Sequence, residues 1–461
     1  MEKVESVPCT FRTEAVGAFA QRCFSPSQGT AVNQGCAFRG AKLALQPITD
    51  AAHLVHGPIT CQGHSWSVRP TASSGSRLHR STFITDLGEM DIIYGGERKL
   101  AQAIDGIVSR HDPAAVFVYQ TCLPAMIGDD IKAVCRTMSA RCGRPVIAVD
   151  APGFAGGKDS GNTFAGQVLL DQVIGTREPD FVTDYDIVLI GEYNVAGSVD
   201  IIRSLLGRLG IRILASIPGD GRYRDIASSH RAKASLTLCS RAMVDLGDRL
   251  QARFGIPGIA GSLYGLAQTS STLRNLATLL ARQTGKSAFI KQAQALIAEA
   301  ETATWRFLAP FKKRLQGKRA LLVAGGTKSW SLINALEEIG LTVVGSTLQK
   351  TSADDRRRAR EIAAARNIHL YENLGSHRLE TLLLREEVDV LLSGMGSSFA
   401  AARAGIAWVD ISHHRTSPLA GYEGVVRLAE EIDAACHNPV FAQARLPAPW
   451  EDEWLINAQA A

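Results

Sequence analysis

The chain has 461 residues, and at roughly 150 residues per domain this length predicts about three domains. Hydrophobic residues make up 46% and charged residues 21% of the sequence, which excludes wholesale disorder. The formal net charge is only +5, and no block of Lys and Arg is interleaved with aromatic residues, which argues against a nucleic-acid-binding protein. No run of about eighteen apolar residues occurs, so we expect no membrane span.

The N-terminal segment MEKVESVPCT lacks an apolar signal core, so we expect a cytosolic protein. Nine scattered cysteines in such a protein favour free thiols or metal ligands over a disulfide framework. The first eighty residues are rich in Gly, Ser, Pro and His and contain few long apolar runs. We therefore expect loops there, of the kind that carries functional residues in a large domain.

After residue 80 the sequence predicts alternating strands and helices. Short runs rich in Val and Ile and closed by Gly or Pro are typical of buried parallel strands, and they occur at 115–119, 146–149, 187–190, 211–217 and 236–238. Helical patterns lie between them. Ile201, Leu205 and Leu209, for example, repeat at a spacing of four and so share one helical face.

A third block of the same kind begins near residue 318. Its predicted strands are 320–324, 341–345, 388–392 and 407–411, and its predicted helices are 329–339 and 354–366. Residues 270–315 read as purely helical and connect the second block to the third. The predicted fold class is therefore α/β, with an open parallel sheet occurring three times.

Four cysteines are candidates for chemistry. Cys122 and Cys239 follow predicted strands, where active sites of open sheets lie, and Cys36 and Cys61 each have a glycine close by. Their spacing is long, so no local zinc or ferredoxin pattern exists, and buried thiols are an open alternative. We expect the remaining five to be core or surface thiols: Cys9, Cys23, Cys135, Cys142 and Cys436.

Two glycine turns and several histidines leave alternatives open. The segment GGTKS at 325–329 follows a strand and could bind an anion at a helix start, but it is neither a phosphate loop nor a dinucleotide fingerprint. A plain turn is the favoured interpretation, and the second glycine turn at 394–397 leaves the same two alternatives. His413 and His414 could ligate metal or form an exposed pair. His53 and His56 are not predicted ligands and could be polar loop residues.

Several segments together resemble the nitrogenase component 1-like family, most closely the alpha-type subunits of the scaffold that assembles the iron–molybdenum cofactor. They are GCAFRGAKLALQPITDAAHLVHGPITCQGHSW, SSGSRLHRSTFITDLGEMDIIYGGERKL, LIGEYNVAG, RLGIRIL, GDGRYRDIASSHRAKASLTLCSRAM, GGTKSWS and LAGYEGV. The resemblance covers nearly the whole chain. It implies three Rossmann-like domains around a central cofactor pocket. We place these domains at 1–180, 181–315 and 316–461.

The resemblance also implies a heterotetramer of two alpha-type and two beta-type chains, with a 4Fe–4S cluster at each interface between unlike chains. Cys36, Cys61 and Cys122 would be its ligands, and the beta-type partner would supply the fourth. Thiolates are the ligands that iron–sulfur clusters prefer, and a cluster with three thiolates from one chain needs a fourth ligand from another. We expect the three cysteines to converge at a surface within roughly 7 Å of one another.

Cys239 matches the family cysteine that ligates one end of the large cofactor. In a scaffold this ligand would hold an iron–sulfur precursor, which matures by exchange of one iron for molybdenum and by addition of homocitrate. The nitrogenase iron protein would supply electrons. A helix is predicted after Cys239, and its dipole would favour a thiolate. Lys158, Lys328 and Arg69 could attract an anionic cluster or homocitrate.

Departures from the family pattern favour a scaffold over a catalytic subunit. The catalytic alpha chain has a histidine ligand for molybdenum where this chain has Ile411 or Ser412, and His413 is one or two places out of register. Asn162 replaces an active-site histidine, and Lys158 replaces a glutamine. His413 stays a candidate transient ligand. The alternatives are a catalytic alpha subunit of nitrogenase or of a related two-component reductase, and a cluster-free sugar- or nucleotide-binding protein.

Overall fold

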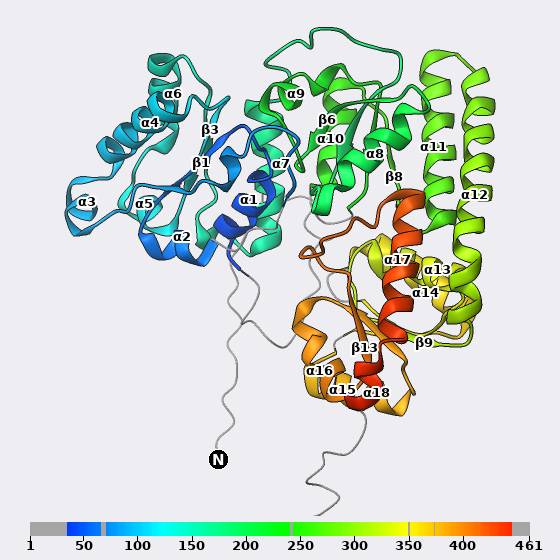
Figure 1. Cartoon of the computed structure of the whole chain (residues 1–461). Helices are drawn as coiled ribbons and strands as arrows, with labels where there is room; N and C mark the ends of the chain where they lie inside the picture. Colours follow the sequence, from blue (N-terminus) through cyan, green and yellow to red (C-terminus); the bar gives the residue numbers. More distant parts are fainter. Residues whose placement is uncertain (1–34, 66–70, 240–242, 349–350, 373, 445–461) are drawn as a thin grey trace, which may run out of the picture.

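A computed structural model describes most of the chain, namely residues 35–65, 71–239, 243–348, 351–372 and 374–444. Cys9, Cys23 and Arg69 lie outside these residues. The described residues form three parallel β-sheets that follow one another along the chain (Figure 1). One sheet lies within each of the ranges 1–180, 181–315 and 316–461.

The first sheet lies between two layers of helices. In spatial order its strands are β2 (Phe83–Ile84), β1 (Ala52–His56), β3 (Val116–Gln120) and β4 (Val146–Val149). Alternate residues of the strands point to opposite faces. Leu54 and Val118 pack with α4 (Glu97–His111) and α6 (Ile131–Cys142), whereas Val55 and Phe117 pack with α1 (Ala37–Leu45) and α7 (Lys158–Gln172).

The second sheet shares its core with the first on one face and with the third on the other. Its strands, in spatial order, are β6 (Arg212–Ile217), β5 (Asp186–Ile190), β7 (Ala234–Thr237) and β8 (Gly258–Ala260). Its helices are α8 (Ser198–Gly207), α9 (Tyr223–Ala227) and α10 (Val244–Phe254), followed by the long pair α11 (Leu266–Thr284) and α12 (Ala288–Leu315). This pair occupies the segment that the sequence predicts to be purely helical.

The third sheet has five strands in the order β11 (His369–Tyr371), β10 (Thr342–Thr347), β9 (Arg319–Leu322), β12 (Val390–Ser393) and β13 (Ala407–Asp410). Its helices are α13 (Lys328–Glu338), α14 (Ala353–Arg366), α15 (Ser376–Arg385), α16 (Ser398–Arg403), α17 (Gly421–Cys436) and α18 (Pro439–Ala444). No helix within the described ranges is long and apolar enough to cross a membrane.

Helices α1 and α7 cross at very short range because each has a glycine that faces the backbone of the other helix. A Cβ atom on Gly40 would lie 2.0 Å from the carbonyl oxygen of Lys158, and one on Gly161 would lie 2.0 Å from that of Ala37. No side chain fits at either position. The crossing therefore fixes the start of α1, and with it Cys36, against the start of α7.

The expectation that the first eighty residues are loops is wrong for the part that the structure describes. Helix α1, strand β1 and helix α2 (Ile59–Ser65) all lie there. Strand β1 has the sequence AHLVH, and its two histidines interrupt the apolar run that is typical of a buried strand. His53 and His56 are both buried rather than placed in a loop.

Candidate functional site

The carboxyl ends of three neighbouring strands of the first sheet meet at one edge. Strand β1 leads into α2 with Cys61, and β3 leads into α5 (Cys122–Ile127) with Cys122 as its first residue. Strand β4 leads into the turn η4 (Gly153–Ala155). The sheet order places β1 and β3 side by side with the chain leaving in opposite directions, which is where open α/β sheets bind ligands.

Gly153 shows how close two of these cysteines are. A Cβ atom on Gly153 would lie 2.7 Å from Sγ of Cys122 and 3.4 Å from Sγ of Cys36. The two sulfur atoms are therefore no farther apart than the sum of these distances. Cys36 precedes α1, and its backbone pairs with Gly157 just before α7.

Cys61 belongs to the same group. Burial raises the pKa of its thiol, and the neighbouring Cys122 and Cys36 raise it further, while a hydrogen bond with the side chain of Thr121 lowers it. All three cysteines are partly exposed and free of disulfides. The structure thus brings Cys36, Cys61 and Cys122 together at an accessible edge of the first sheet.

The three thiols fit a cluster better than a single ion. Among the residues that the structure describes, no three His, Cys, Asp or Glu side chains are close enough to hold one metal ion. In an iron–sulfur cluster each thiolate binds its own iron, so the ligands stand farther apart. Gly153 leaves the space beside Cys122 and Cys36 that a side chain would otherwise fill.

We expect Gly153→Ala to impair metal binding at this edge without unfolding the domain. The added methyl group would stand 2.7 Å from Sγ of Cys122, closer than a Cβ and a sulfur can approach. The measurement is iron per purified complex, with Gly157→Ala as the control, because a Cβ on Gly157 meets no atom within 4 Å. Equal iron in wild type and Gly153→Ala would show that this space is not used.

Cys239 lies at the corresponding point of the second sheet. It follows β7, and Gly191, which follows the adjacent strand β5, packs against it. A Cβ on Gly191 would lie 2.6 Å from Cβ of Cys239, and Gly191 also has φ +86°, so glycine is needed there on two counts. Helix α10 begins only at Val244, and residues 240–242 between lie outside the described residues.

Carboxyl ends of the third sheet face Cys239 from the other side. The hydroxyl of Thr327 donates a hydrogen bond of 3.3 Å to the carbonyl of Leu238, the residue before Cys239. Lys328 donates to the carbonyl of Ile411 at 2.6 Å and lies 5.3 Å from the ring centre of Tyr264. The GGTKS turn therefore joins the second and third sheets beside Cys239.

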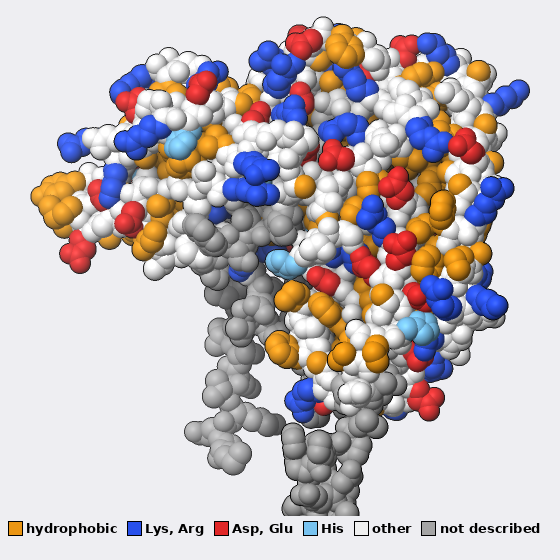
Figure 2. All heavy atoms as spheres, in the orientation of Figure 1, with side chains coloured by type: hydrophobic (Ala, Val, Ile, Leu, Met, Phe, Trp, Pro, Cys, Tyr) orange, Lys and Arg blue, Asp and Glu red, His pale blue; other side chains and the backbone are white. Residues whose placement is uncertain are grey.

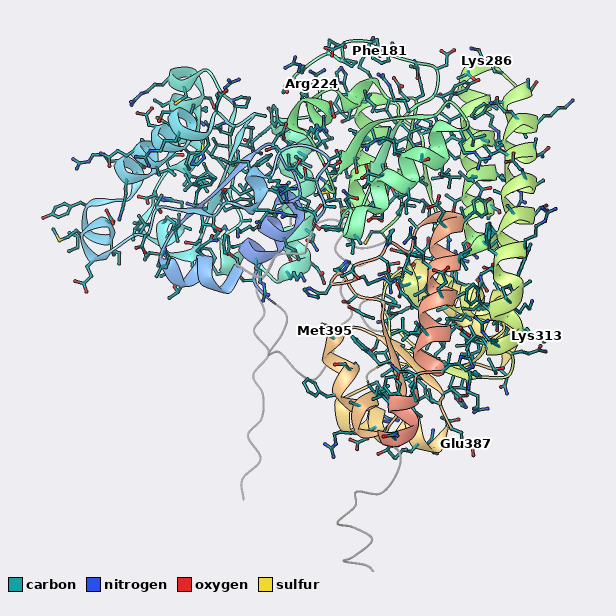
Figure 3. The ribbon with its side chains drawn as sticks, viewed as in Figure 1. Phe181, Arg224, Lys286, Lys313, Glu387 and Met395 are labelled. Carbon is teal, nitrogen blue, oxygen red and sulfur yellow. The ribbon has the colours of Figure 1, made fainter. Side chains whose placement is uncertain are left out.

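His413 lies on the same side of the molecule. Its ring centre is 6.1 Å from that of Tyr193, two residues beyond Gly191. Met395 opens the turn η7 (Met395–Ser397) after β12, and Figure 3 shows it at the edge of the third sheet that faces the first domain. His414 is exposed. Lys328 therefore follows the residue that bonds Leu238, and His413 lies near Tyr193, two residues beyond Gly191; their part in a pocket at Cys239 stays a prediction.

Lys158 and Asn162 occupy the first turns of α7. The carbonyl of Lys158 packs against Gly40 of α1. Asn162 is buried, and its Oδ1 accepts no hydrogen bond within the described part of the chain. A buried acceptor without a partner is costly, and a polar ligand would satisfy it. Their part in a cofactor pocket stays a prediction.

Comparisons with known proteins agree over nearly the whole chain. The family model of nitrogenase component 1 type oxidoreductases matches residues 36–437. The chain belongs to this family. It is 49% identical over 417 residues to the nitrogenase iron-molybdenum cofactor biosynthesis protein NifE of Bradyrhizobium diazoefficiens, a match that covers 90% of this chain and 76% of the relative. The protein of the same name from Mesorhizobium japonicum is 46% identical and covers 96% and 89%, respectively.

Solved structures give the same fold. A structure of nitrogenase Cp1 at pH 6.5 superposes with a TM-score of 0.80 at 26% identity, covering 93% of this chain and 92% of the other. The predicted nitrogenase component 1-like α/β fold is confirmed. The family assignment made from the quoted motifs is confirmed as well.

An exposed apolar rim lies on the elements that carry Cys61 and Cys122 and on two elements beside them in the first domain. It comprises side chains on α2, on α3 (Glu89–Tyr94), on α5 and on η4, namely Ile59, Met90, Ile92, Ile93, Tyr94, Met126 and Phe154. Tyr94 is 79% exposed and Met126 is 76% exposed. Figure 2 shows apolar atoms gathered at the tip formed by α3.

Several residues of this component 1-like site belong to no pattern in the sequence that marks them. Gly153 and Thr121 contact the cysteines, and neither belongs to a pattern that marks a ligand. The signal for Gly153 was its place in DAPGF, directly after a predicted strand. The sequence pattern does not connect His56 with the cysteines and is equally typical of a polar loop residue.

Proposed function

We propose that this chain is a scaffold subunit for maturation of the nitrogenase iron–molybdenum cofactor. The observation that carries the proposal is that relatives named for this role are 43–49% identical to it over nine-tenths or more of its length. The family works with metal–sulfur clusters, a related second subunit and an iron protein. The chain itself would hold and orient a cofactor precursor rather than reduce dinitrogen.

The three-cysteine group would hold a 4Fe–4S cluster shared with the partner. Cys36, Cys61 and Cys122 supply three thiolates at an accessible edge, so a fourth ligand must come from outside the described residues. When bound, the cluster would supply one-electron chemistry. The exposed apolar rim of the first domain offers the beta-type subunit, NifN in this reading, a surface to bury in a heterotetramer.

The second group would hold the precursor. Cys239 supplies a thiolate ligand at one end, and Lys328 supplies a positive charge on the face that lies opposite. Lys158 and Asn162 are further candidates, Lys158 for attraction of homocitrate and Asn162 for a hydrogen bond to a polar ligand. Molybdenum, homocitrate and electrons from the iron protein would reach the precursor here, before transfer to the nitrogenase MoFe protein.

One observation favours the catalytic alternative. His413 lies near the region of Cys239, where a second ligand of a retained cofactor would stand. In a scaffold the same ring could serve as a transient ligand. The identity of the relatives weighs against a catalytic subunit.

We expect the complex of this chain with its partner to activate cofactor-deficient nitrogenase, given iron protein, ATP, molybdate and homocitrate. With iron protein, ATP and a reductant but no nitrogenase, the same complex should form little ammonia from dinitrogen, because Asn162 stands where the resemblance places a histidine in the catalytic subunit. Acetylene and dinitrogen reduction assays measure both outcomes. Robust ammonia production by the complex alone would overturn the scaffold assignment.

A further inference from the structure

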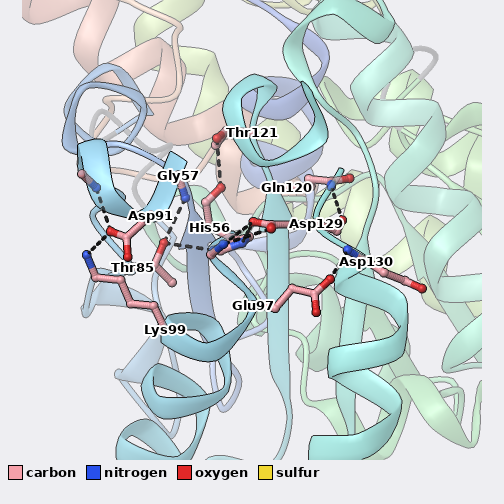
Figure 4. A network of polar contacts seen from close by, with 12 residues as sticks. His56, Gly57, Thr85, Asp91, Glu97, Lys99, Gln120, Thr121, Asp129 and Asp130 are labelled. Carbon is pink, nitrogen blue, oxygen red and sulfur yellow. Dashed lines mark hydrogen bonds and ion pairs between the residues drawn. The ribbon is translucent and has the colours of Figure 1, made fainter. Parts of the chain in front are cut away.

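A buried polar network connects the end of β1 with the residues on either side of α5, the helix that Cys122 begins (Figure 4). Its centre is His56, the last residue of β1, whose side chain is fully buried. Nε2 of His56 lies 3.0 Å from Oδ2 of Asp129, and Nδ1 lies 3.1 Å from the hydroxyl of Thr85. The amide of Gly57 donates to the same Thr85 hydroxyl at 3.1 Å. Every bond of the ring is satisfied when Nε2 carries the proton and donates to Asp129, and Nδ1 accepts a hydrogen bond from the Thr85 hydroxyl.

His56 contacts both ends of α5, the short helix that Cys122 begins. At the start, the amide and the hydroxyl of Thr121 both donate to the carbonyl of His56, at 3.1 and 2.9 Å. At the end, Asp129 meets the His56 ring two residues beyond Ile127. Six residues held at both ends have little freedom to shift.

Asp129 ties this arrangement to the rest of the domain. Its carboxylate accepts the amide of Gly96 at 3.0 and 3.2 Å, at the start of α4. A Cβ on Gly96 would lie 2.7 Å from Oδ2 of Asp129 and 2.9 Å from Cε1 of His56, so the contact is fully packed. Gln120 donates to the Asp129 carbonyl at 3.2 Å.

The same network reaches Cys61. Thr121, whose hydroxyl donates to the carbonyl of His56, lies beside the thiol of Cys61 and lowers the pKa of that thiol. A Cβ on Gly57 would lie 2.0 Å from the Thr121 hydroxyl oxygen. Only glycine therefore fits at this position of the segment that leads to Cys61. One residue thus connects the two segments that carry Cys61 and Cys122.

We propose that His56, through Asp129 and Thr121, is the positioning residue that holds Cys61 and Cys122 at the separation a 4Fe–4S cluster requires. This inference rests on the proposed function, because it assumes a cluster at the three thiols. His56 does not bind the cluster. It acts from behind the ligands, as outer partners of metal ligands do.

The test compares three variants of the complex purified anaerobically with its partner. His56→Leu removes both ring contacts, whereas His56→Gln keeps a donor in the position of Nε2. His53→Leu is the matched control, because His53 is also buried on β1 but bonds Tyr119 and Ile48 instead. Each variant is assayed for iron loss to a chelator, for the electron paramagnetic resonance spectrum of the reduced cluster, and for thermal unfolding.

We expect iron to leave His56→Leu about tenfold faster or more, with an altered spectrum, and His56→Gln to restore both toward wild type. His53→Leu should keep the wild-type rate and spectrum even where its melting temperature falls equally. A wild-type rate and spectrum in His56→Leu would overturn the inference, and so would equal changes in His53→Leu. Absence of a cluster from the wild-type complex would instead refute the proposed function.

Discussion

Replacing Cys36 with alanine should remove the proposed interfacial cluster from the complex while the chain stays folded. Sγ of Cys36 and Sγ of Cys122 lie on either side of the space beside Gly153, and loss of one thiolate leaves two ligands in this chain. The expected result is loss of the four irons of that cluster and of the matching acid-labile sulfide. Metal and sulfide analysis after anaerobic purification measures it.

The control for this experiment is Cys135→Ala. Cys135 is buried in α6, and burial raises the pKa of its thiol to about 12, so it stays protonated and unreactive at neutral pH. Its removal should leave iron and sulfide unchanged. Cys36→Ala with the full wild-type content of both would refute the assignment of this cysteine as a ligand.

Replacing Cys239 with alanine should release the precursor but keep the interfacial cluster. Cys239 directly follows β7, and the carbonyl of the residue before it accepts a hydrogen bond from Thr327, which precedes α13 of the third sheet. Even changes behind a metal ligand cost about 10–100-fold in affinity, so loss of the ligand itself should cost at least as much. The measurement is precursor iron that stays with the complex through gel filtration.

Cys142→Ala serves as the control for the second experiment. Its thiol lies at the end of α6 and contacts Asp105 in the first domain, so it should not affect precursor retention. A Cys239→Ala complex that retains wild-type precursor would show that another residue anchors it. His413→Ala in the same assay would then test the candidate second ligand.

Much of the fold could be predicted from local patterns because its strands are buried on both faces. The run VIAV became β4 without a change of bounds, and the helical segment before residue 316 became α11 and α12. Strand β1 could not be predicted in the same way. His53 and His56 interrupt its apolar pattern, and only the fold reveals that Tyr119 and Asp129 satisfy them.

The candidate site could be predicted only through family resemblance. Cys36, Cys61 and Cys122 are far apart in sequence, and their meeting depends on the order of β1, β3 and β4 in the sheet. Spacing carries no information about such contacts. Gly153 could not be predicted for the same reason. Its role is to leave space beside two sulfur atoms, which only the fold brings next to it.

The most direct test of the account is to count iron and acid-labile sulfide in four complexes, each purified anaerobically with the partner. These are wild type, Cys36→Ala, Cys239→Ala and the double variant. We expect two separate losses in the single variants and their sum in the double variant, because the two groups lie on different sheets. A wild-type complex without acid-labile sulfide, or an iron content that neither single change lowers, would contradict it.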